Sequence, residues 1–137
     1  KWNVSNVKSM DGMLESLYYF NQPLNNWNVS NVTSMSGMFF NAHHFNKPLN
    51  KWDVSNVKCT ANMFFAGVNF NQSLNNWNVS NVTNFNGMFS NCYNFNQPLN
   101  KWKLDKVEYM DGMFYLCNNF KQSLDDWNIP NDTNIFS

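Results

Sequence analysis

The stretch LNNWNVSNVTSMSGMFFN at residues 24–41 decides the fold, because it returns nearly unchanged at residues 74–91 as LNNWNVSNVTNFNGMFSN. The six tryptophans follow one another at one constant interval, without an insertion or deletion, at Trp2, Trp27, Trp52, Trp77, Trp102 and Trp127. A fixed period of this size indicates a repeat architecture. We therefore divide the chain into five full units, 2–26, 27–51, 52–76, 77–101 and 102–126, and a partial sixth from residue 127.

Apolar residues recur at fixed places in every full unit. In the second unit they are Val29, Val32, Met38, Phe45 and Leu49, and the other units carry similar residues at the same offsets from their tryptophan. One unit cannot enclose so many large side chains alone, but stacked neighbours bury each row against its own copies. This stacking explains the constant length of the units, since an insertion in one unit would put its apolar residues out of register with those of its neighbours.

The pattern within a unit predicts a short strand followed by a helical turn. Residues 24–30 alternate apolar and polar, which is typical of a strand with one buried face, and residues 32–42 repeat at three- and four-residue steps. Glycines such as Gly37 keep the second segment short and irregular, as a short helix or 3-10 turn. Residues 1–137 are thus expected to form a single repeat solenoid (α/β) domain with parallel strands. Because the chain starts at Lys1 in mid-unit, we expect it to be a fragment of a longer array.

Composition narrows the function classes. The chain has 137 residues, nine acidic residues, nine lysines and no arginine, so the net charge is zero and the guanidinium group that suits phosphates is missing. We expect no nucleic-acid partner. No run approaches the roughly 18 apolar residues of a membrane span, so we expect no membrane contact by this segment.

The string L-x-x-W-x-V-S-x-V-T-x-M-x-x-M-F-x-x-C-x-x-F, legible from Leu74 to Phe95 with Phe85 in the first Met position, resembles the BspA-like leucine-rich repeats of bacterial surface proteins. It is more similar still to the 25-residue variant of mycoplasma-type surface lipoproteins, a family of unknown function. The resemblance covers the whole chain and implies a right-handed leucine-rich-repeat-like coil at the cell surface or secreted, with any anchor outside this segment. The departures are the charged fifth unit, with Lys103, Asp105, Lys106 and Glu108, and the degenerate sixth.

Several residue rows admit a binding interpretation beside a structural one. The tryptophans share a face with the valines, so we interpret them as core residues, with a sugar-binding row of indoles as the alternative. We interpret the asparagine rows as ladders that satisfy turn backbone, with ligand-facing amides as the alternative. Cys92 and Cys117 occupy equivalent places in adjacent units, within disulfide reach, and we interpret them as core thiols. Cys59, His43 and His44 complete no metal site, and neither a cofactor nor an enzymatic activity is expected.

The remaining candidate surface is the outward face of the expected strands. It comprises Asn3, Ser5, Asn28, Ser30, Asp53, Ser55, Asn78, Ser80, Lys103 and Asp105. This face predicts a non-enzymatic module for protein binding or adhesion, with a host surface protein as the partner and the charges of the third and fifth units supplying selectivity. A structural spacer or variable coat array is the alternative, and glycan binding through amides and the tyrosines Tyr18, Tyr19 and Tyr93 is a weaker one.

Overall fold

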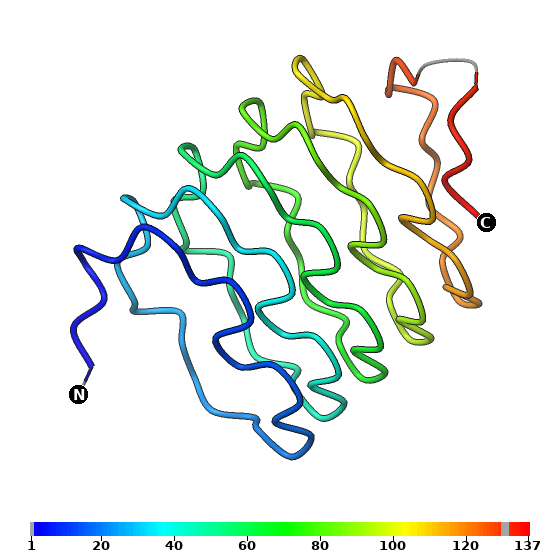
Figure 1. Cartoon of the computed structure of the whole chain (residues 1–137). Coiled ribbons are helices and arrows are strands. Elements are labelled where there is room, and N and C mark those ends of the chain that lie inside the picture. The colour runs from blue at the N-terminus through cyan, green and yellow to red at the C-terminus, as the bar shows by residue number, and fades with distance from the viewer. Residues whose placement is uncertain (1, 130–131) are drawn as a thin grey trace.

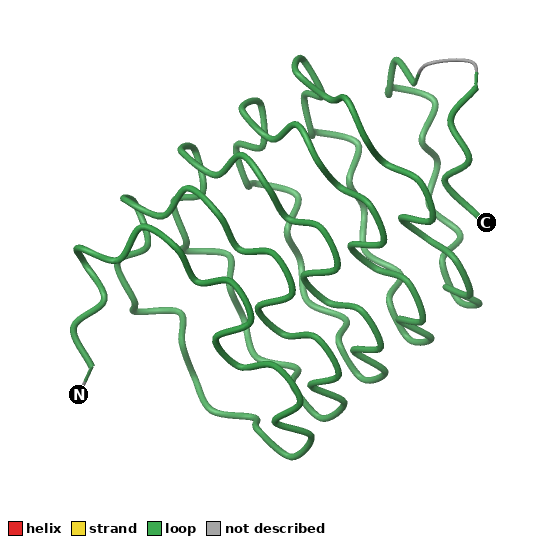
Figure 2. Cartoon of the chain, in the orientation of Figure 1, coloured by secondary structure: helices red, strands yellow, loops and turns green. Residues whose placement is uncertain are grey.

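The computed structural model describes residues 2–129 and 132–137 of the expected 1–137 domain, and residues 1, 130 and 131 lie outside the described part. Within the described part the chain passes back and forth in successive loops that lie side by side in sequence order (Figure 1). This part contains no helix and no named strand (Figure 2). Isolated parallel bridges join equivalent residues of successive units, at Ser9, Ser34, Cys59, Asn84 and Tyr109.

Backbone hydrogen bonds between neighbouring units define the stacking. The N–H groups of Met35, Gly37, Phe39 and Asn41 in the second unit donate to carbonyls of the third unit, over 2.8 to 2.9 Å. The first, third and fourth units each make four equivalent bonds to the unit that follows them. Every full unit but the last is therefore joined to its successor by the same four bonds, which keeps the units in register.

The residues that lie between these donors, such as Met38 and Phe40, form hydrogen-bonded turns within their own unit. Met38 N–H donates to the Met35 carbonyl over 3.2 Å, and Phe40 N–H donates to the Gly37 carbonyl over 3.0 Å. Gly37 and Asn41 have φ values of 60° and 58°, in the left-handed region that such turns require. Each full unit repeats this pair of left-handed residues four positions apart. The chain thus alternates between bonds to the next unit and bonds to itself.

The expected secondary structure is corrected by these bonds. Residues 32–42 form no helix or 3-10 segment, because alternate N–H groups leave the unit instead of continuing a helical ladder. Residues 24–30 form no strand, because Trp27 N–H and Val32 N–H turn back to the carbonyls of Leu24 and Val29 over 2.9 Å each. The alternating pattern around the tryptophan comes from consecutive turns. The assignment to a right-handed, leucine-rich-repeat-like solenoid stays a prediction.

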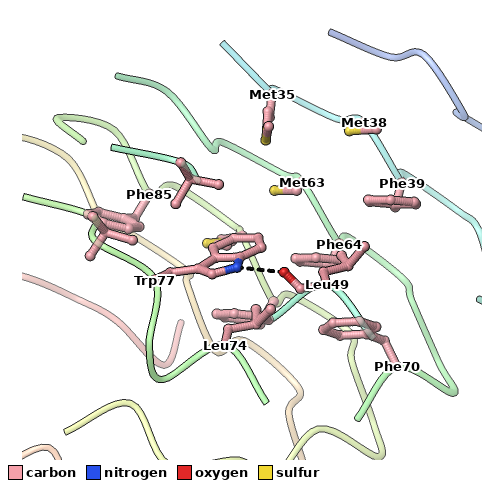
Figure 3. Close-up of a cluster of buried hydrophobic side chains, with 14 of the residues drawn as sticks. Met35, Met38, Phe39, Leu49, Met63, Phe64, Phe70, Leu74, Trp77 and Phe85 are labelled. Carbon is pink, nitrogen blue, oxygen red and sulfur yellow. Dashed lines mark hydrogen bonds between the residues drawn. The ribbon is translucent and has the colours of Figure 1, made fainter. Parts of the chain in front are cut away.

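The core is one cluster of buried side chains that runs from Val4 to Ile135. Like side chains lie on like along the stack: the ring centroids of Phe39 and Phe64 are 5.3 Å apart, and those of Phe64 and Phe89 are 5.7 Å apart. Figure 3 shows part of this cluster, with Phe64, Phe70 and the Trp77 indole among its members. Rings at these separations gain stacking energy in addition to the free energy of apolar burial.

Each buried tryptophan also fixes the spacing between units. Trp77 Nε1 donates over 2.9 Å to the carbonyl of Leu49, which lies 28 residues earlier in the chain, and this bond is drawn in Figure 3. The same bond links Trp52 to Leu24, Trp102 to Leu74 and Trp127 to Leu99, over 2.9 to 3.0 Å. Since a buried indole N–H needs a partner, the tryptophan can be buried only when the earlier segment that carries this leucine carbonyl is in place.

Candidate functional site

The candidate face lies on turns beside the tryptophans, and not on strands as the sequence suggested. Its residues are all exposed or half-buried, and equivalent positions recur on successive units. In each of the first four units, the Asn or Asp after the tryptophan accepts two hydrogen bonds from the Ser two residues later. In the second unit these bonds measure 3.1 Å from Ser30 N and 2.7 Å from Ser30 Oγ to Asn28 Oδ1.

This arrangement is an Asx turn, in which a side-chain oxygen satisfies the backbone of its own corner. The Asn side-chain oxygens are therefore occupied, while the amide nitrogens of Asn3, Asn28 and Asn78 make no hydrogen bond to the described residues. The face consequently offers fixed amide donors to a partner in the first, second and fourth units. Sequence reasoning placed these residues outward correctly but missed that they are bonded in pairs.

The third unit replaces the Asn with Asp53, which makes the same two bonds to Ser55 at 2.6 and 3.0 Å. The Ser55 hydroxyl, and after it the Ser55 backbone N–H, hold the pKa of Asp53 below its usual value. The carboxylate is therefore ionised at neutral pH, and this exposed negative charge lies in the same place as the Asn amides of the neighbouring units.

The fifth unit loses the Asx turn. Lys103 occupies the Asn position and has no acceptor to offer Asp105, which occupies the Ser position. The turn that follows is looser, because Val107 N lies 3.4 Å from the Leu104 carbonyl oxygen, whereas the equivalent bonds of the first four units measure 2.9 to 3.0 Å. Both charged side chains are exposed, so this end of the face presents a cation and an anion two residues apart.

Shallow hollows accompany the face where successive tryptophan turns meet. One of about 440 Å³ is lined by Trp2, Asn3, Asn26 and Trp27 among others. Two more, of about 300 and 330 Å³, occur at equivalent places, the first beside Asn78 and Lys103 and the second beside Lys103, Asp105 and Asp126. Five of the ten predicted residues line these hollows: Asn3, Asn28, Asn78, Lys103 and Asp105.

The tryptophans of the third to sixth units are core residues, whereas the side chain of the first tryptophan is exposed to solvent. Trp52, Trp77, Trp102 and Trp127 are buried, whereas Trp27 is half-buried and Trp2 is 68% exposed. Trp2 stacks on Trp27 with ring centroids 6.2 Å apart. A continuous row of exposed indoles is therefore absent from the described residues.

The asparagine ladders are confirmed. Asn31, Asn56 and Asn81 each donate their side-chain amide to a Ser carbonyl of the preceding unit over 2.7 to 2.8 Å. Asn21, Asn46, Asn71 and Asn96 each accept the backbone N–H of the equivalent residue in the next unit over 2.9 to 3.0 Å. These hydrogen bonds stabilise the stack.

Cys92 and Cys117 are free buried thiols that donate to the carbonyls of Phe64 and Phe89. Burial raises the pKa of Cys117 to about 12, and burial together with the neighbouring Cys117 raises the pKa of Cys92 well above its usual value. Such thiols are protonated and poorly nucleophilic at neutral pH. Cys59 is a half-buried free thiol.

The two histidines each lie over a tyrosine of the preceding unit. The ring centroids of Tyr18 and His43 are 5.0 Å apart, and those of Tyr19 and His44 are 5.1 Å apart. Among the residues that the structure describes, no three His, Cys, Asp or Glu side chains are grouped as a metal would require. No helix in this part of the chain has the length and apolarity needed to cross a membrane.

These features define a repeat protein built from units of constant length that are joined by backbone and side-chain hydrogen bonds. The model of the family described as "Mycoplasma protein of unknown function, DUF285" matches the chain twice, over residues 1–69 and 50–137. The chain belongs to this family. No curated protein matches the chain.

Proposed function

We propose that the chain is a non-enzymatic, surface-exposed module for protein binding or adhesion to host or neighbouring cells. The observation that carries this proposal is the row of Asx turns in the first four units, in which Asn3, Asn28 and Asn78 each hold an amide donor beside a hollow. A pre-ordered face loses little conformational entropy on binding, so weak individual contacts add up along its length.

We further propose that the units form a right-handed solenoid of the BspA-like leucine-rich-repeat type, displayed as part of a surface lipoprotein or secreted protein. The support is the match of spacing and residue type at the apolar rows, together with the parallel bridges between equivalent residues of successive units. A solenoid presents one surface of each unit in a continuous line, which suits an extended protein partner.

The chemistry of the face favours a protein partner over a nucleic acid or a glycan. Amide donors pair with backbone carbonyls and with side-chain acceptors, and Asp53, Lys103 and Asp105 add charges of both signs for selectivity. The buried tryptophans do not offer the flat rings on which sugars stack, apart from the first unit. A spacer or variable coat array remains the second candidate, because the many bonds between units suit a stiff rod.

The proposal is tested by a variant whose face charges are replaced by the residues that other units carry: Asp53→Asn, Lys103→Asn and Asp105→Ser. Each replacement retains or restores the Asx turn, so the fold is kept. We expect the fluorescently labelled variant to bind cultured host epithelial cells several-fold more weakly than the natural chain. A matched control, Lys47→Gln with Glu15→Ser, also brings in residues of other units but lies outside the face.

Two treatments of the cells separate the candidate functions. Trypsin treatment should abolish binding to a protein partner, whereas periodate treatment should abolish binding to a glycan. Absence of binding to host cells and to cells of the source bacterium alike would favour the spacer. Equal binding by the face variant and the control would contradict the role given to the three charges of the face.

A further inference from the structure

A second pair of stacked rings lies outside the core. Phe39 and Phe64 stack in the buried row. The residues that follow them, Phe40 and Phe65, stack on each other with ring centroids 4.7 Å apart and an angle of 7° between the rings. Both outer rings are half-buried, and the core cluster with the side chains packed against it includes neither. They lie on the side of the stack, because the second and third units each have a neighbour before and after them.

The third unit is apolar near this pair at positions where its neighbours are polar. In the same unit as Phe65 it carries Ala61 and Ala66, and both alanines are half-buried. The second and fourth units carry polar residues at these two positions, namely Ser36, Asn41, Asn86 and Asn91. The change of residue type gathers apolar side chains on the side of two interior units, and exposed apolar patches mark interaction sites.

Ala66 is a poor choice for the backbone that it occupies. Its φ is 56°, and the equivalent Asn41 and Asn91 have φ values of 58° and 60°. Asparagine tolerates this left-handed region better than alanine does. The third unit therefore carries a less stable residue at this position and keeps the position apolar, which is expected where a surface serves binding.

A hollow of about 350 Å³ lies beside the outer rings, with Phe40 in its lining. The lining also includes two acidic residues, Asp11 and Glu15, and two neutral polar ones, Ser36 and Asn62. The Asp11 carboxylate is tied to the second unit, since its Oδ1 accepts the Ser36 N–H over 2.8 Å. The hollow thus combines an aromatic ring with negative charge.

This combination fits a cation that is carried on an apolar stem. A lysine ammonium or an arginine guanidinium is attracted by carboxylates and also by the face of an aromatic ring. The aliphatic stem of either side chain can lie along the rings of Phe40 and Phe65 while its charged end stays at the hollow. The carboxylates would repel an acidic segment, and a purely apolar segment would gain nothing from them. The charge of the hollow therefore favours a basic residue.

We propose that this side of the stack is a second docking surface, which binds a protein segment that carries a lysine or arginine beside an apolar side chain. We call this surface the flank, and it comprises Asp11, Glu15, Phe40, Ala61, Phe65 and Ala66. The basic group enters the hollow, and the apolar neighbour covers Phe65 and the two alanines. The flank shares no residue with the ten-residue face of Asx turns, so the proposal does not rest on the function proposed for that face.

The test selects peptides from a random library displayed on phage. The library is first depleted on a flank variant, Phe40→Ser with Phe65→Ser, and is then selected on the natural chain. Serine is the residue that the fourth unit carries at this position, as Ser90. We expect the selected peptides to share a lysine or arginine next to a leucine, isoleucine or aromatic residue, and to bind the flank variant about tenfold more weakly. A control, Tyr93→Ser, removes an exposed ring outside the flank and should bind them as the natural chain does.

Two further variants separate binding from folding. Ala66→Asn should raise the melting temperature by roughly 2 °C, because asparagine relieves the left-handed strain, and yet bind the selected peptides several-fold more weakly. Asp11→Asn with Glu15→Gln should also weaken binding and remove most of its salt dependence.

The proposal is overturned if no peptide prefers the natural chain to the flank variant, if the preferring peptides lack a basic residue, or if Ala66→Asn and the charge variant bind them as tightly as the natural chain. The test is distinct from that of the Asx-turn face, because it uses peptides and not cells. Cell binding that is lost in the control that carries Glu15→Ser, and kept in the face variant, would support the flank and contradict the face.

Discussion

The side chain of each buried tryptophan is tied to a leucine that lies 28 residues earlier in the chain. The Leu49 carbonyl accepts both the backbone N–H of Trp52, over 3.1 Å, and the indole N–H of Trp77, over 2.9 Å. Both lone pairs of this oxygen are therefore occupied within the core. The Trp77 indole also stacks on the Trp52 indole, and their ring centroids are 6.4 Å apart.

Trp77→Phe should lower the free energy of unfolding by about 1–2 kcal/mol, because it removes one net hydrogen bond and part of a buried ring. Urea unfolding followed by circular dichroism measures the loss. Trp2→Phe is the matched control, and since Trp2 is largely exposed it should change stability by less than about 0.5 kcal/mol. Equal effects at the two positions would contradict the buried role of the interior indoles.

The buried thiols predict a fall in stability at alkaline pH. Burial raises the pKa of Cys117 from its ordinary 9.0 to about 12, so between these values the unfolded thiol loses its proton and the folded thiol keeps it. The folded state then binds more protons, and its stability declines as pH rises above 9.0. Under reducing conditions, the stability advantage of the natural chain over Cys117→Ala should shrink by on the order of 1 kcal/mol between pH 8 and pH 10. A constant difference would show that Cys117 is not desolvated.

At the scale of one unit, the Asx turn sets how firmly the tryptophan corner closes. Lys103→Asn with Asp105→Ser should restore the missing turn of the fifth unit and raise the free energy of unfolding by about 0.5–1 kcal/mol. The reverse exchange in the fourth unit, Asn78→Lys with Ser80→Asp, should lower it by a similar amount. Urea titrations of both variants measure the two changes, and a loss of stability in the restored fifth unit would contradict the role given to the turn.

The sequence predicted which residues of a unit are buried. Val29, Val32, Met38, Phe45 and Leu49 are all buried, as their fixed spacing indicated. This succeeded because stacking in register leaves each position in the same environment in every interior unit. The spacing of apolar residues is the same in every unit and does not show which units have neighbours on both sides. It therefore did not predict the exposure of Trp2, which stacks on Trp27 alone.

The sequence could not place the bonds between units. Alternation around Trp27 suggested a strand there, yet the parallel bridge falls at Ser34, inside the segment expected to be helical. Turns of three-residue span repeat apolar side chains at nearly the same steps as a helix does, so periodicity alone does not separate them. The glycines Gly12, Gly37, Gly87 and Gly112 were the available signal, since a residue that permits a left-handed backbone at one place in four of the five full units disfavours a continuous helix.

The candidate site was predicted in part. The outward placement of Asn28 and Asp53 followed from the burial of their neighbours and agrees with their exposure. The bonds from Ser30 and Ser55 were foreseeable from the Asn-x-Ser and Asp-x-Ser spacing, which is typical of Asx turns, but the strand interpretation concealed them. The hollows depend on how adjacent units meet and leave no trace in one unit's sequence.

At the scale of the molecule, one core cluster of buried side chains extends from Val4 to Ile135. Stability in such an array is the sum of terms within units and terms between nearest neighbours. The interior units have a neighbour on both sides, while the first unit has one.

The register of neighbouring units is tested most directly by NMR scalar coupling across a hydrogen bond. We predict a coupling between the amide nitrogen of Gly37 and the carbonyl carbon of Ala61 in the next unit, because these groups are bonded over 2.9 Å. A helix at this place would instead couple Gly37 to the carbonyl of Thr33, four residues earlier. Coupling to Thr33, or none to Ala61 in a folded sample, would contradict the stacking of the units.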